Sequence, residues 1–481
     1  MDVFYELHAR FVFFGLGIFY KPRPYSFFRS FFTKCCHRFS QPMTNQSAVS
    51  QFSASRWAFL KQRLDDRSHC LHVVGLGAFG GNLALVKYLL SCGHRLELWE
   101  KKGPEDLAES RQALGDWGEQ LKVHWHSEPQ LPKDDLIFVT PAMAPSHAAL
   151  REISPCYLTT EIEISLALAA EKKVVIHAIT GSVGKSTSAC LMAQALDCEV
   201  FGNIGRSLLA ELEPWPRELV LEISSYQLHY LQFSQWCPSS GLMTPLRDHH
   251  ATWHGSVVAY QNCKLDAMNS WAKIVPCTWA EELRSTGGQR SVAPEELKAL
   301  WQGRSLTLLG QHNYQNALAV SQHCEIMGRL DKTSLDRMEA FPGLPHRLEL
   351  CLKSGPYRCI NDSKATSPGA VIQALRSVDQ GCWLILQGVP TGDPVEMLEL
   401  AQARCSRVIF IGGMQAISSR ITWNRLQPEI WENLEGFFQS LTGLQADLLF
   451  SPGGPSYDQY LNYEKRGEHF SQLCRDVLGS S

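Results

Sequence analysis

The sequence of 481 residues lacks several features that would narrow its class at once. Its formal net charge is only −3, so no excess of positive charge indicates a nucleic-acid or anionic-membrane partner. None of its 16 cysteines forms a Cys-x-x-Cys pair, which favours buried thiols in a reducing cytosol over a disulfide framework. Internal repeats and low-complexity linkers are also missing. We therefore expect a cytoplasmic globular protein of about three domains, with no nucleic-acid or membrane partner.

A long hydrophobic run is missing even from the first 42 residues, whose composition differs from the rest. They hold 13 aromatic residues, six Lys or Arg and two acids. The apolar stretch 11–20 is too short for a membrane span, which needs about 20 residues, and no clear signal cleavage site follows it. Three interpretations stay open for this segment: a membrane-surface or targeting arm, a poorly ordered extension, or translation from a start upstream of a true beginning at Met43.

What the sequence does contain is a phosphate-binding pattern. An apolar strand at 174–176 leads to the small-residue loop 181–184, and Lys185 then opens an apolar helical run. Glycines allow the backbone N–H groups of such a loop to point at anionic oxygens, and the helix N-terminus and the lysine add positive charge. The hydroxyl of Ser186 is placed to coordinate Mg²⁺. A standard loop has glycine where this chain has Ile179, so the loop is a shorter variant.

A second glycine pattern, Gly75-x-Gly77-x-x-Gly80, follows an apolar strand. A helical run at 83–90 and a second strand that ends at Glu100 complete the start of a βαβ unit. In that context the glycines indicate a Rossmann-like nucleotide site. A tight turn with close helix–strand packing and no ligand is the alternative.

Two more α/β units follow the first along the chain. Their predicted strands lie at 174–176, 219–224, 241–244, 357–360, 382–387, 407–412 and 447–450. We predict an α/β fold of three consecutive domains with clefts between them. After an N-terminal extension at 1–68, these are a Rossmann-like nucleotide-binding domain at 69–170, a P-loop ATPase-like central domain at 171–342 and a Rossmann-like C-terminal domain at 343–481.

Polar motifs occur along these units in a distinctive order. They are Thr180–Thr187, Gly202–Gly205, Leu221–Leu228, Asp248-His249, Lys264, Gly310–Asn316, Gly343-Leu-Pro-His-Arg347, Asn361-Asp-Ser-Lys-Ala-Thr366, Ser451–Asp458 and Asn462–Gly467. In this order and spacing the chain resembles the Mur ligases over roughly residues 70–481. The blocks at 343–347 and 361–366 are the most specific part of the resemblance.

The resemblance implies an ATP-dependent enzyme of peptidoglycan synthesis that joins an amino acid to a carboxylate. The carboxylate takes the γ-phosphate of ATP to give an acyl phosphate, which the amine then attacks. The implied substrates are UDP-N-acetylmuramoyl-L-alanine, bound by the first domain, and D-glutamate, bound by the last. The resemblance further implies ATP and Mg²⁺ as cofactors, a carbamylated lysine at Lys264 and a monomeric protein.

Site residues follow from the motifs that match the family. For ATP the resemblance implies Gly181, Ser182, Val183, Gly184, Lys185, Ser186, Thr187, Asn316, Arg347 and Asp362. For the metal it implies Ser186, Glu222, His249 and Lys264, and for catalysis Lys185, His249, Lys264 and Lys364. For the two other substrates it implies Gly77, Glu100, Asn203, Ser224, Gln227, Thr366, Ser456 and Tyr463.

Taken alone, several of these residues have simpler explanations. Glu222 could be a strand-end acid paired with a basic side chain, His249 a structural histidine, Lys264 a surface lysine and 361–366 a polar turn. A ligand-binding role for Glu222 has a physical basis, because burial of an acid at the end of an apolar strand costs free energy unless the acid binds something. A bare lysine beside Mg²⁺ is repelled, whereas a carbamate is anionic.

Departures from the family pattern concentrate at substrate positions. Val183 stands where asparagine is usual, Phe79 where a small hydroxyl residue is common, and Tyr463 where phenylalanine is usual, and the stretch 248–252 lacks an acid and an arginine. Thr391 falls near the position of a lysine that pairs in the family with the side-chain carboxylate of D-glutamate. The main alternative is therefore a divergent paralogue with an altered acceptor or a non-catalytic binding role in wall synthesis. The motif blocks disfavour a folylpolyglutamate synthetase-like ligase.

Overall fold

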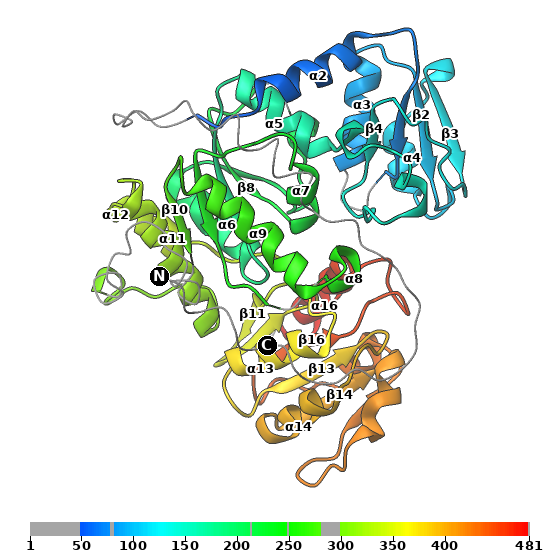
Figure 1. The fold of residues 1–481 in the computed structure, drawn as a ribbon. Helices are drawn as coiled ribbons and strands as arrows, with labels where there is room; N and C mark the ends of the chain where they lie inside the picture. Colours follow the sequence, from blue (N-terminus) through cyan, green and yellow to red (C-terminus); the bar gives the residue numbers. More distant parts are fainter. Residues whose placement is uncertain (1–48, 77–80, 212–213, 248–249, 280–298, 480–481) are drawn as a thin grey trace, which may run out of the picture. The chain divides into compact units, whose positions relative to one another are not determined.

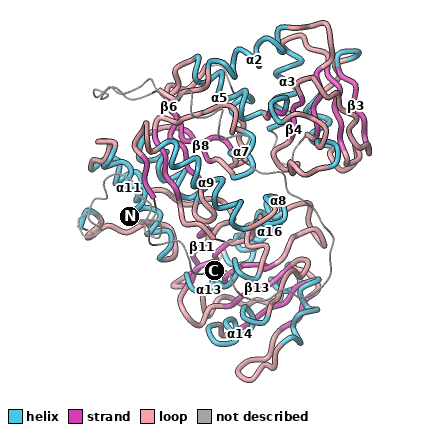
Figure 2. The backbone as a smooth tube through the Cα atoms, viewed as in Figure 1, coloured by secondary structure: helices cyan, strands magenta, loops and turns pink. Residues whose placement is uncertain are grey.

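The computed structural model describes residues 49–76, 81–211, 214–247, 250–279 and 299–479, and within these ranges three β-sheets organise the chain (Figure 1). Residues 1–48, Gly77 and His249 lie outside the described residues, so the expectations for them stay predictions. Helices and strands alternate along most of the chain, as Figure 2 shows. The predicted α/β fold with three consecutive sheets is confirmed.

The first sheet has the strand order β3-β2-β1-β4-β5 and is parallel throughout. This is the order of a Rossmann-like sheet, in which ligands bind outside the carboxyl ends of the strands. Its elements are β1 (Leu71–Val74), α3 (Gly81–Ser91), β2 (Leu96–Glu100), α4 (Ala108–Leu114), β3 (Leu121–Trp125), β4 (Ile137–Val139), β5 (Leu158–Thr159) and α5 (Glu161–Glu171), with short 3₁₀ turns at Gly118–Gln120, Ala148–Leu150 and Pro155–Tyr157.

The second sheet has the order β10-β9-β6-β8-β7 and is also parallel. The predicted strands at 174–176, 219–224 and 241–244 are β6, β8 and β9, with ends shifted by one to four residues. The elements are β6 (Val175–Thr180), α6 (Lys185–Leu196), β7 (Glu199–Gly202), the 3₁₀ turn Leu208–Glu211, β8 (Glu218–Glu222), α7 (Ser225–Tyr230), β9 (Ser240–Met243), α8 (Ala251–His254), α9 (Val257–Trp271), β10 (Cys277–Trp279), α11 (Gln311–Ile326) and α12 (Lys332–Glu339).

The third sheet has the order β11-β12-β16-β13-β14-β15. Its elements are β11 (Glu349–Ser354), β12 (Tyr357–Asn361), α13 (Pro368–Ser377), β13 (Trp383–Gln387), α14 (Val395–Arg404), β14 (Arg407–Ile411), the 3₁₀ segment Gly412–Arg420, β15 (Glu429–Trp431), α15 (Leu434–Gln439), β16 (Leu448–Gly453) and α16 (Tyr463–Leu478). The edge strand β11 pairs antiparallel with β12 and was not predicted, because its sequence is not distinctly apolar. The other pairings are parallel.

Both faces of the second and third sheets are buried, as expected for parallel sheets. In β8, Leu221 packs in one apolar cluster and Val220 in another. In β13, Leu384 and Ile385 divide in the same way between two clusters. Such sheets have little exposed surface except at their strand ends, which is where polar side chains can gather. None of the helices in the described ranges combines the length and apolar character that a bilayer span requires.

A short N-terminal segment is tied to both of the first two sheets. Gln51 exchanges backbone hydrogen bonds with Cys237 of the second unit (2.8 and 2.9 Å). Helix α2 (Ala54–Asp65), which Ser53 caps, then packs Leu60 into the core of the first unit. Arg56 of this helix is buried and forms two hydrogen bonds with the buried carboxylate of Glu163 (2.9 and 2.8 Å). This buried ion pair holds α2 against α5.

We expect Arg56→Met to lower the free energy of unfolding by about 3–5 kcal/mol, because it leaves Glu163 buried without a charge partner. Denaturant titration followed by tryptophan fluorescence would measure the change. The matched control is Lys61→Met on the same helix, whose pair with Glu171 is about half exposed. The control should cost less than about 1 kcal/mol. Equal losses in the two variants would contradict the importance of the buried pair.

Candidate functional site

The loop between β6 and α6 has the conformation that its glycines were expected to allow. Gly181 has φ +140°, and a Cβ atom there would collide with the side chain and backbone of Thr244. Gly184 has φ +80°, and a Cβ atom there would lie 2.6 Å from Oδ1 of Asn316. Only glycine combines these backbone conformations with such close neighbours. The loop therefore passes directly beside β9 and α11, at the N-terminus of α6.

Lys185 lies at the start of α6 with its side chain turned back to the loop. Its Nζ donates to the carbonyl of Ser182 (3.1 Å). Burial lowers the pKa of Lys185, while the carboxylate of Glu222 acts in the opposite direction and Arg347 lowers it further. Ser182 is itself held, because its Oγ accepts from the N–H of Arg247 (2.8 Å) and lies 2.6 Å from the hydroxyl of Tyr260. The loop, the lysine and the helix N-terminus together have the arrangement that favours binding of an anion.

Glu222 ends β8 close to this loop and is 1% exposed. Its Oε1 accepts from Nδ2 of Asn203 (2.9 Å), whereas its Oε2 is buried without a hydrogen-bond partner among the described residues. A buried, unpaired carboxylate oxygen is unfavourable unless a cation or donor reaches it. No basic side chain forms an ion pair with Glu222 in the described ranges, so the simpler explanation offered for it is not supported.

Glu222 and Ser186 offer oxygen atoms, and a hard divalent cation prefers oxygen ligands. Ser186 follows Lys185 at the start of α6 and is buried, and its Oγ accepts from Nη2 of Arg347 (3.3 Å). His249, the other expected ligand, lies outside the described residues. Among the side chains that are described, no group of three or more His, Cys, Asp or Glu residues is arranged as a metal site. Glu222 and Ser186 thus supply two oxygen ligands of the expected kind.

Lys264 on α9 is not a surface residue, so that alternative is wrong. It is 1% exposed, and its Nζ donates to Oγ1 of Thr180 at the end of β6 (3.0 Å). Burial and the nearby charge of Lys185 hold the pKa of Lys264 well below the ordinary lysine value. Burial of an amine beside Lys185 is unfavourable for its charged form, and the only hydrogen bond described for it is the one to Thr180.

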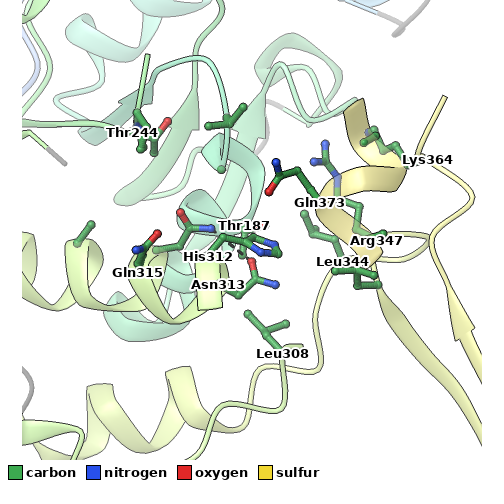
Figure 3. A pocket seen from close by; sticks show the side chains of 18 of the residues that line it. Thr187, Thr244, Leu308, His312, Asn313, Gln315, Leu344, Arg347, Lys364 and Gln373 are labelled. Carbon is green, nitrogen blue, oxygen red and sulfur yellow. Dashed lines mark hydrogen bonds between the residues drawn. The ribbon is translucent and has the colours of Figure 1, made fainter. Parts of the chain in front are cut away.

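A cavity of about 650 Å³ opens beside the phosphate loop (Figure 3). This volume lies in the usual range for a small-molecule site. Its lining includes Val183, Gly184, Thr187, Thr244, Leu308, His312, Asn313, Asn316, Leu344, Arg347, Asp362, Lys364 and Gln373. Arg347, Lys364 and Leu344 face it from the yellow C-terminal segments, and Thr187, His312 and Asn313 from the central domain. The structure therefore brings together ATP-site residues expected from separate motifs.

The turn that presents Arg347 is strained. His346 and Leu348, on either side of it, have φ +61° and +47°, although neither is glycine. Such conformations cost about 1–3 kcal/mol each and persist only where the surroundings impose them. Here Oδ1 of Asp362 accepts from the N–H of Leu348 (3.2 Å), and the carbonyl of His346 accepts from the N–H of Lys364 (3.1 Å). The block 361–366 thus holds Arg347 toward the phosphate loop.

Asp362 has a second partner, since its Oδ2 accepts from Oγ of Ser451 (2.7 Å). Burial raises the pKa of Asp362 to about 7. Lys364 donates from Nζ to the hydroxyl of Tyr463 (3.1 Å), and burial, assisted by Arg347, lowers its pKa to about 8. The Tyr463 ring lies 4.9 Å from the same Nζ. The polar turn 361–366 is therefore a network whose charges face the cavity, not a solvated loop.

The residues expected on the substrate side have mixed surroundings. Ser224 and Gln227 form a capping box at the start of α7, which occupies part of their hydrogen-bonding capacity. Glu100 accepts from the backbone N–H of Leu76 (2.8 Å) and of Lys102 (3.0 Å), so it binds the backbone that directly follows β1. Asn203 bonds to Glu222, as described above.

The expected acceptor residues come from the C-terminal unit. Ser456 is 2% exposed, and Thr366 is half-buried. The hydroxyl of Thr391 donates to the carbonyl of Thr366 (3.4 Å), so the position that lacks the family's lysine does lie beside an expected acceptor residue. Thr366, Thr391 and Tyr463 are thus drawn together around the block 361–366.

Among the polar cavity residues that sequence reasoning missed are His312 and Gln373. His312 lies one turn before Asn316 on α11, so helical spacing would have placed both on one face. Gln373 lies on α13 of the C-terminal unit, and no local pattern connects it with α11. Only the packing of the two units against the cavity shows that Gln373 belongs to the site (Figure 3).

The chain has a phosphate loop on a parallel sheet, a Rossmann-like sheet before it and a third α/β unit after it. The phosphate loop and the third unit line one cavity. These features define a multidomain nucleotide-binding α/β protein. The chain is 30% identical over 428 residues to UDP-N-acetylmuramoylalanine–D-glutamate ligase of Thermotoga sp. strain RQ2, covering 83% of this chain and 97% of the relative. It is 30% identical over 430 residues to the ligase of the same name from Thermotoga maritima, covering 84% and 98%. The chain belongs to the Mur ligase family of enzymes.

One more sequence relative and one solved structure agree with this assignment. A ligase of the same name from Parasynechococcus marenigrum is 28% identical over 458 residues, covering 84% of this chain and 98% of the relative. The crystal structure of UDP-N-acetylmuramate–alanine ligase MurC from Thermotoga maritima superposes with a TM-score of 0.54 at 17% identity, covering 84% of this chain and 99% of that one. No protein-family model matches the chain.

The pKa of Lys364 leads to a prediction about pH. Because the lysine is protonated below about pH 8 and neutral above it, its attraction for phosphate is present below that pH and lost above it. We expect affinity for ADP to fall by up to about tenfold between about pH 7.5 and 9. Isothermal titration calorimetry at several pH values would measure this fall. Lys364→Arg should flatten the profile by keeping the charge, and an unchanged profile in Lys364→Met would contradict the assignment.

Proposed function

We propose that this protein joins D-glutamate to UDP-N-acetylmuramoyl-L-alanine with hydrolysis of ATP, a step of peptidoglycan precursor synthesis in the cytoplasm. The names of the relatives at 30% identity support the choice of substrates. The observation that carries the ATP part is the cavity of about 650 Å³ at which the phosphate loop meets Arg347 and Lys364. Lys185 stands at the same loop, so cations from three separate segments surround the place where phosphate would lie.

In the proposed reaction a carboxylate oxygen of the alanyl group attacks the γ-phosphorus of ATP, and ADP leaves. The amine of D-glutamate then attacks the acyl carbon, the amide bond forms, and inorganic phosphate and a proton are released. Lys185 and the loop N–H groups hold the phosphates, and Arg347 and Lys364 neutralise charge that builds up during transfer. Fixed cations in a partly dry site stabilise such charge more than water does. Asp362 keeps Arg347 in position and contacts the ribose.

Glu222 and Ser186 are the described residues that would hold Mg²⁺, and we expect His249 to join them. When bound, the ion would neutralise phosphate charge during transfer. Asn203 orients Glu222 by its hydrogen bond, so that Oε1 is occupied and Oε2 remains available.

We also propose that Lys264 is carbamylated in the active enzyme. A carbamate forms when the neutral amine attacks CO₂ and loses a proton, which converts a buried cation into an anion. Lys264 is 1% exposed and lies beside the cation Lys185, so the anion would be better placed there than an ammonium group. The hydroxyl of Thr180 accepts a hydrogen bond from the amine and donates its own proton to the carbonyl of Ile223 (2.9 Å), so the N–H of a carbamate can keep the same acceptor.

The main competing function is a paralogue with another acceptor. Thr391 favours this alternative, because it bonds to the acceptor residue Thr366 yet carries no charge. The ATP side does not distinguish the two functions, since both need the same cavity. The identity of the amino acid therefore decides between them.

We expect phosphate release that requires ATP, UDP-N-acetylmuramoyl-L-alanine and D-glutamate together. A coupled phosphate assay across L- and D-amino acids, with mass spectrometry of the product, would measure it. Omission of any one substrate is the control. Turnover with a different amino acid alone would establish the paralogue. ATP binding without turnover on any amino acid would contradict the catalytic function.

Lys264→Ala should lower kcat by at least about a thousandfold, by analogy with the loss of one major charge-stabilising group. Excess bicarbonate should not restore the variant, because no amine remains to react. In the native protein, ¹³C-bicarbonate should give a carbamate signal in the NMR spectrum that Lys264→Ala lacks. Retained activity in the variant, or the same signal in both proteins, would remove the carbamate role.

A further inference from the structure

Arg466 on α16 is a buried cation without a carboxylate partner in the described part of the chain. Its side chain is 0% exposed. All four of its hydrogen bonds go to neutral oxygens: Oγ and the carbonyl of Ser363 (3.1 and 2.8 Å), and the carbonyls of Gln387 (3.2 Å) and Gly454 (2.9 Å). Burying a charge without a counter-charge is costly, so its presence calls for an explanation beyond packing.

Arg466 holds together the segments that carry the expected acceptor residues. Ser363 belongs to the turn that continues to Thr366, Gln387 precedes the loop that reaches Thr391, and Gly454 precedes Ser456. The Oγ of Ser363 also donates to the carbonyl of Tyr463, which begins α16 itself (2.7 Å). Every expected acceptor residue therefore lies within a few residues of a bond to this guanidinium or its helix.

The guanidinium comes close to the two loops because they contain glycine. A Cβ atom at Gly388 would lie 2.8 Å from Nη1 of Arg466, and the φ of Gly388 is +109°. The N–H of Val389 donates to the carbonyl of Pro455 (2.8 Å), so the two loops also bond to each other directly above the guanidinium. The guanidinium is therefore in direct contact with the backbone of both loops.

The nearest acidic side chain does not neutralise this charge. Asp458 favours the protonated form of Arg466, but it is exposed and accepts instead from the N–H of Gly413 (3.3 Å). Burial lowers the pKa of Arg466 to about 10, which still leaves the group charged at neutral pH. No described carboxylate pairs directly with the guanidinium, so the positive field at the loops is only partly compensated.

We propose that Arg466 is a positioning residue that shapes the acceptor pocket and provides the positive field for the side-chain carboxylate of the incoming amino acid, in place of a lysine at Thr391. This inference rests on the proposed function and makes an acidic amino acid the acceptor class. The charge acts on the pocket through the loops whose carbonyl groups the guanidinium binds. In a water-poor site such a field falls off slowly with distance.

The test compares KM and kcat for D-glutamate and for its neutral analogue D-glutamine in three variants. Arg466→Met should raise KM for D-glutamate by about tenfold or more, which corresponds to one lost charge interaction, and change KM for D-glutamine much less. Adding Thr391→Lys to Arg466→Met should recover most of the affinity for D-glutamate, because it restores charge without restoring the lost hydrogen bonds. Lys465→Met is the matched control, since Lys465 is the exposed neighbour on the same helix and should not affect KM.

Equal rises in KM for both amino acids, with no recovery by Thr391→Lys, would show a purely structural role and overturn the inference. If Arg466→Met does not fold, Thr391→Lys in the native background decides. With the field of Arg466 already present, the added lysine should lower KM for D-glutamate less than about threefold, and a gain above about tenfold would overturn the inference. Failure of the proposed function is distinguishable, because the native protein would then show no turnover with any acidic amino acid.

Discussion

Three ionisable groups lie at the carboxyl end of one parallel sheet: Lys185, Lys264 and Glu222. The two apolar clusters on the faces of this sheet exclude most water. Charges in such a place are stable only if they compensate one another or bind a ligand. The carboxylate of Glu222 opposes the lowering of the Lys185 pKa by burial, and one of its oxygens has no hydrogen-bond partner among the described residues. The folded protein is therefore built around charges that an anionic nucleotide and a cation would complete.

The C-terminal unit contributes positive charge through a different arrangement. It presents Arg347 on a turn whose left-handed residues are held by Asp362 and Lys364, so the cost of the strained backbone is offset by hydrogen bonds within one motif. Behind this turn, Arg466 bonds only to neutral oxygens of the loops. In the proposed reaction both arginines would place positive charge where substrates bring negative charge. Local strain and unpaired charge thus mark the same region of the molecule.

Prediction from sequence worked best where a pattern is local. Strands such as β13 and β16 are short apolar runs buried on both faces. The glycines of the loop at 181–184 predict its backbone conformation. It failed where pairing or packing decides. The sequence of the edge strand β11 has no distinct apolar pattern. Gln373 on α13 and His312 on α11 line one cavity, although they lie far apart in the sequence. Ser224 and Gln227 matched a substrate motif, yet the structure uses them also as a helix cap.

The sequence by itself determined the class of the fold and the phosphate loop, because strand length, glycine position and a following lysine are properties of neighbouring residues. The family also followed from the sequence, through the order of its motifs. Tertiary structure alone decided that Lys264 is buried and that, among the described residues, an oxygen of Glu222 has no hydrogen-bond partner and Arg466 has no carboxylate partner. Burial and missing partners depend on residues far apart in the chain, so no local pattern can reveal them.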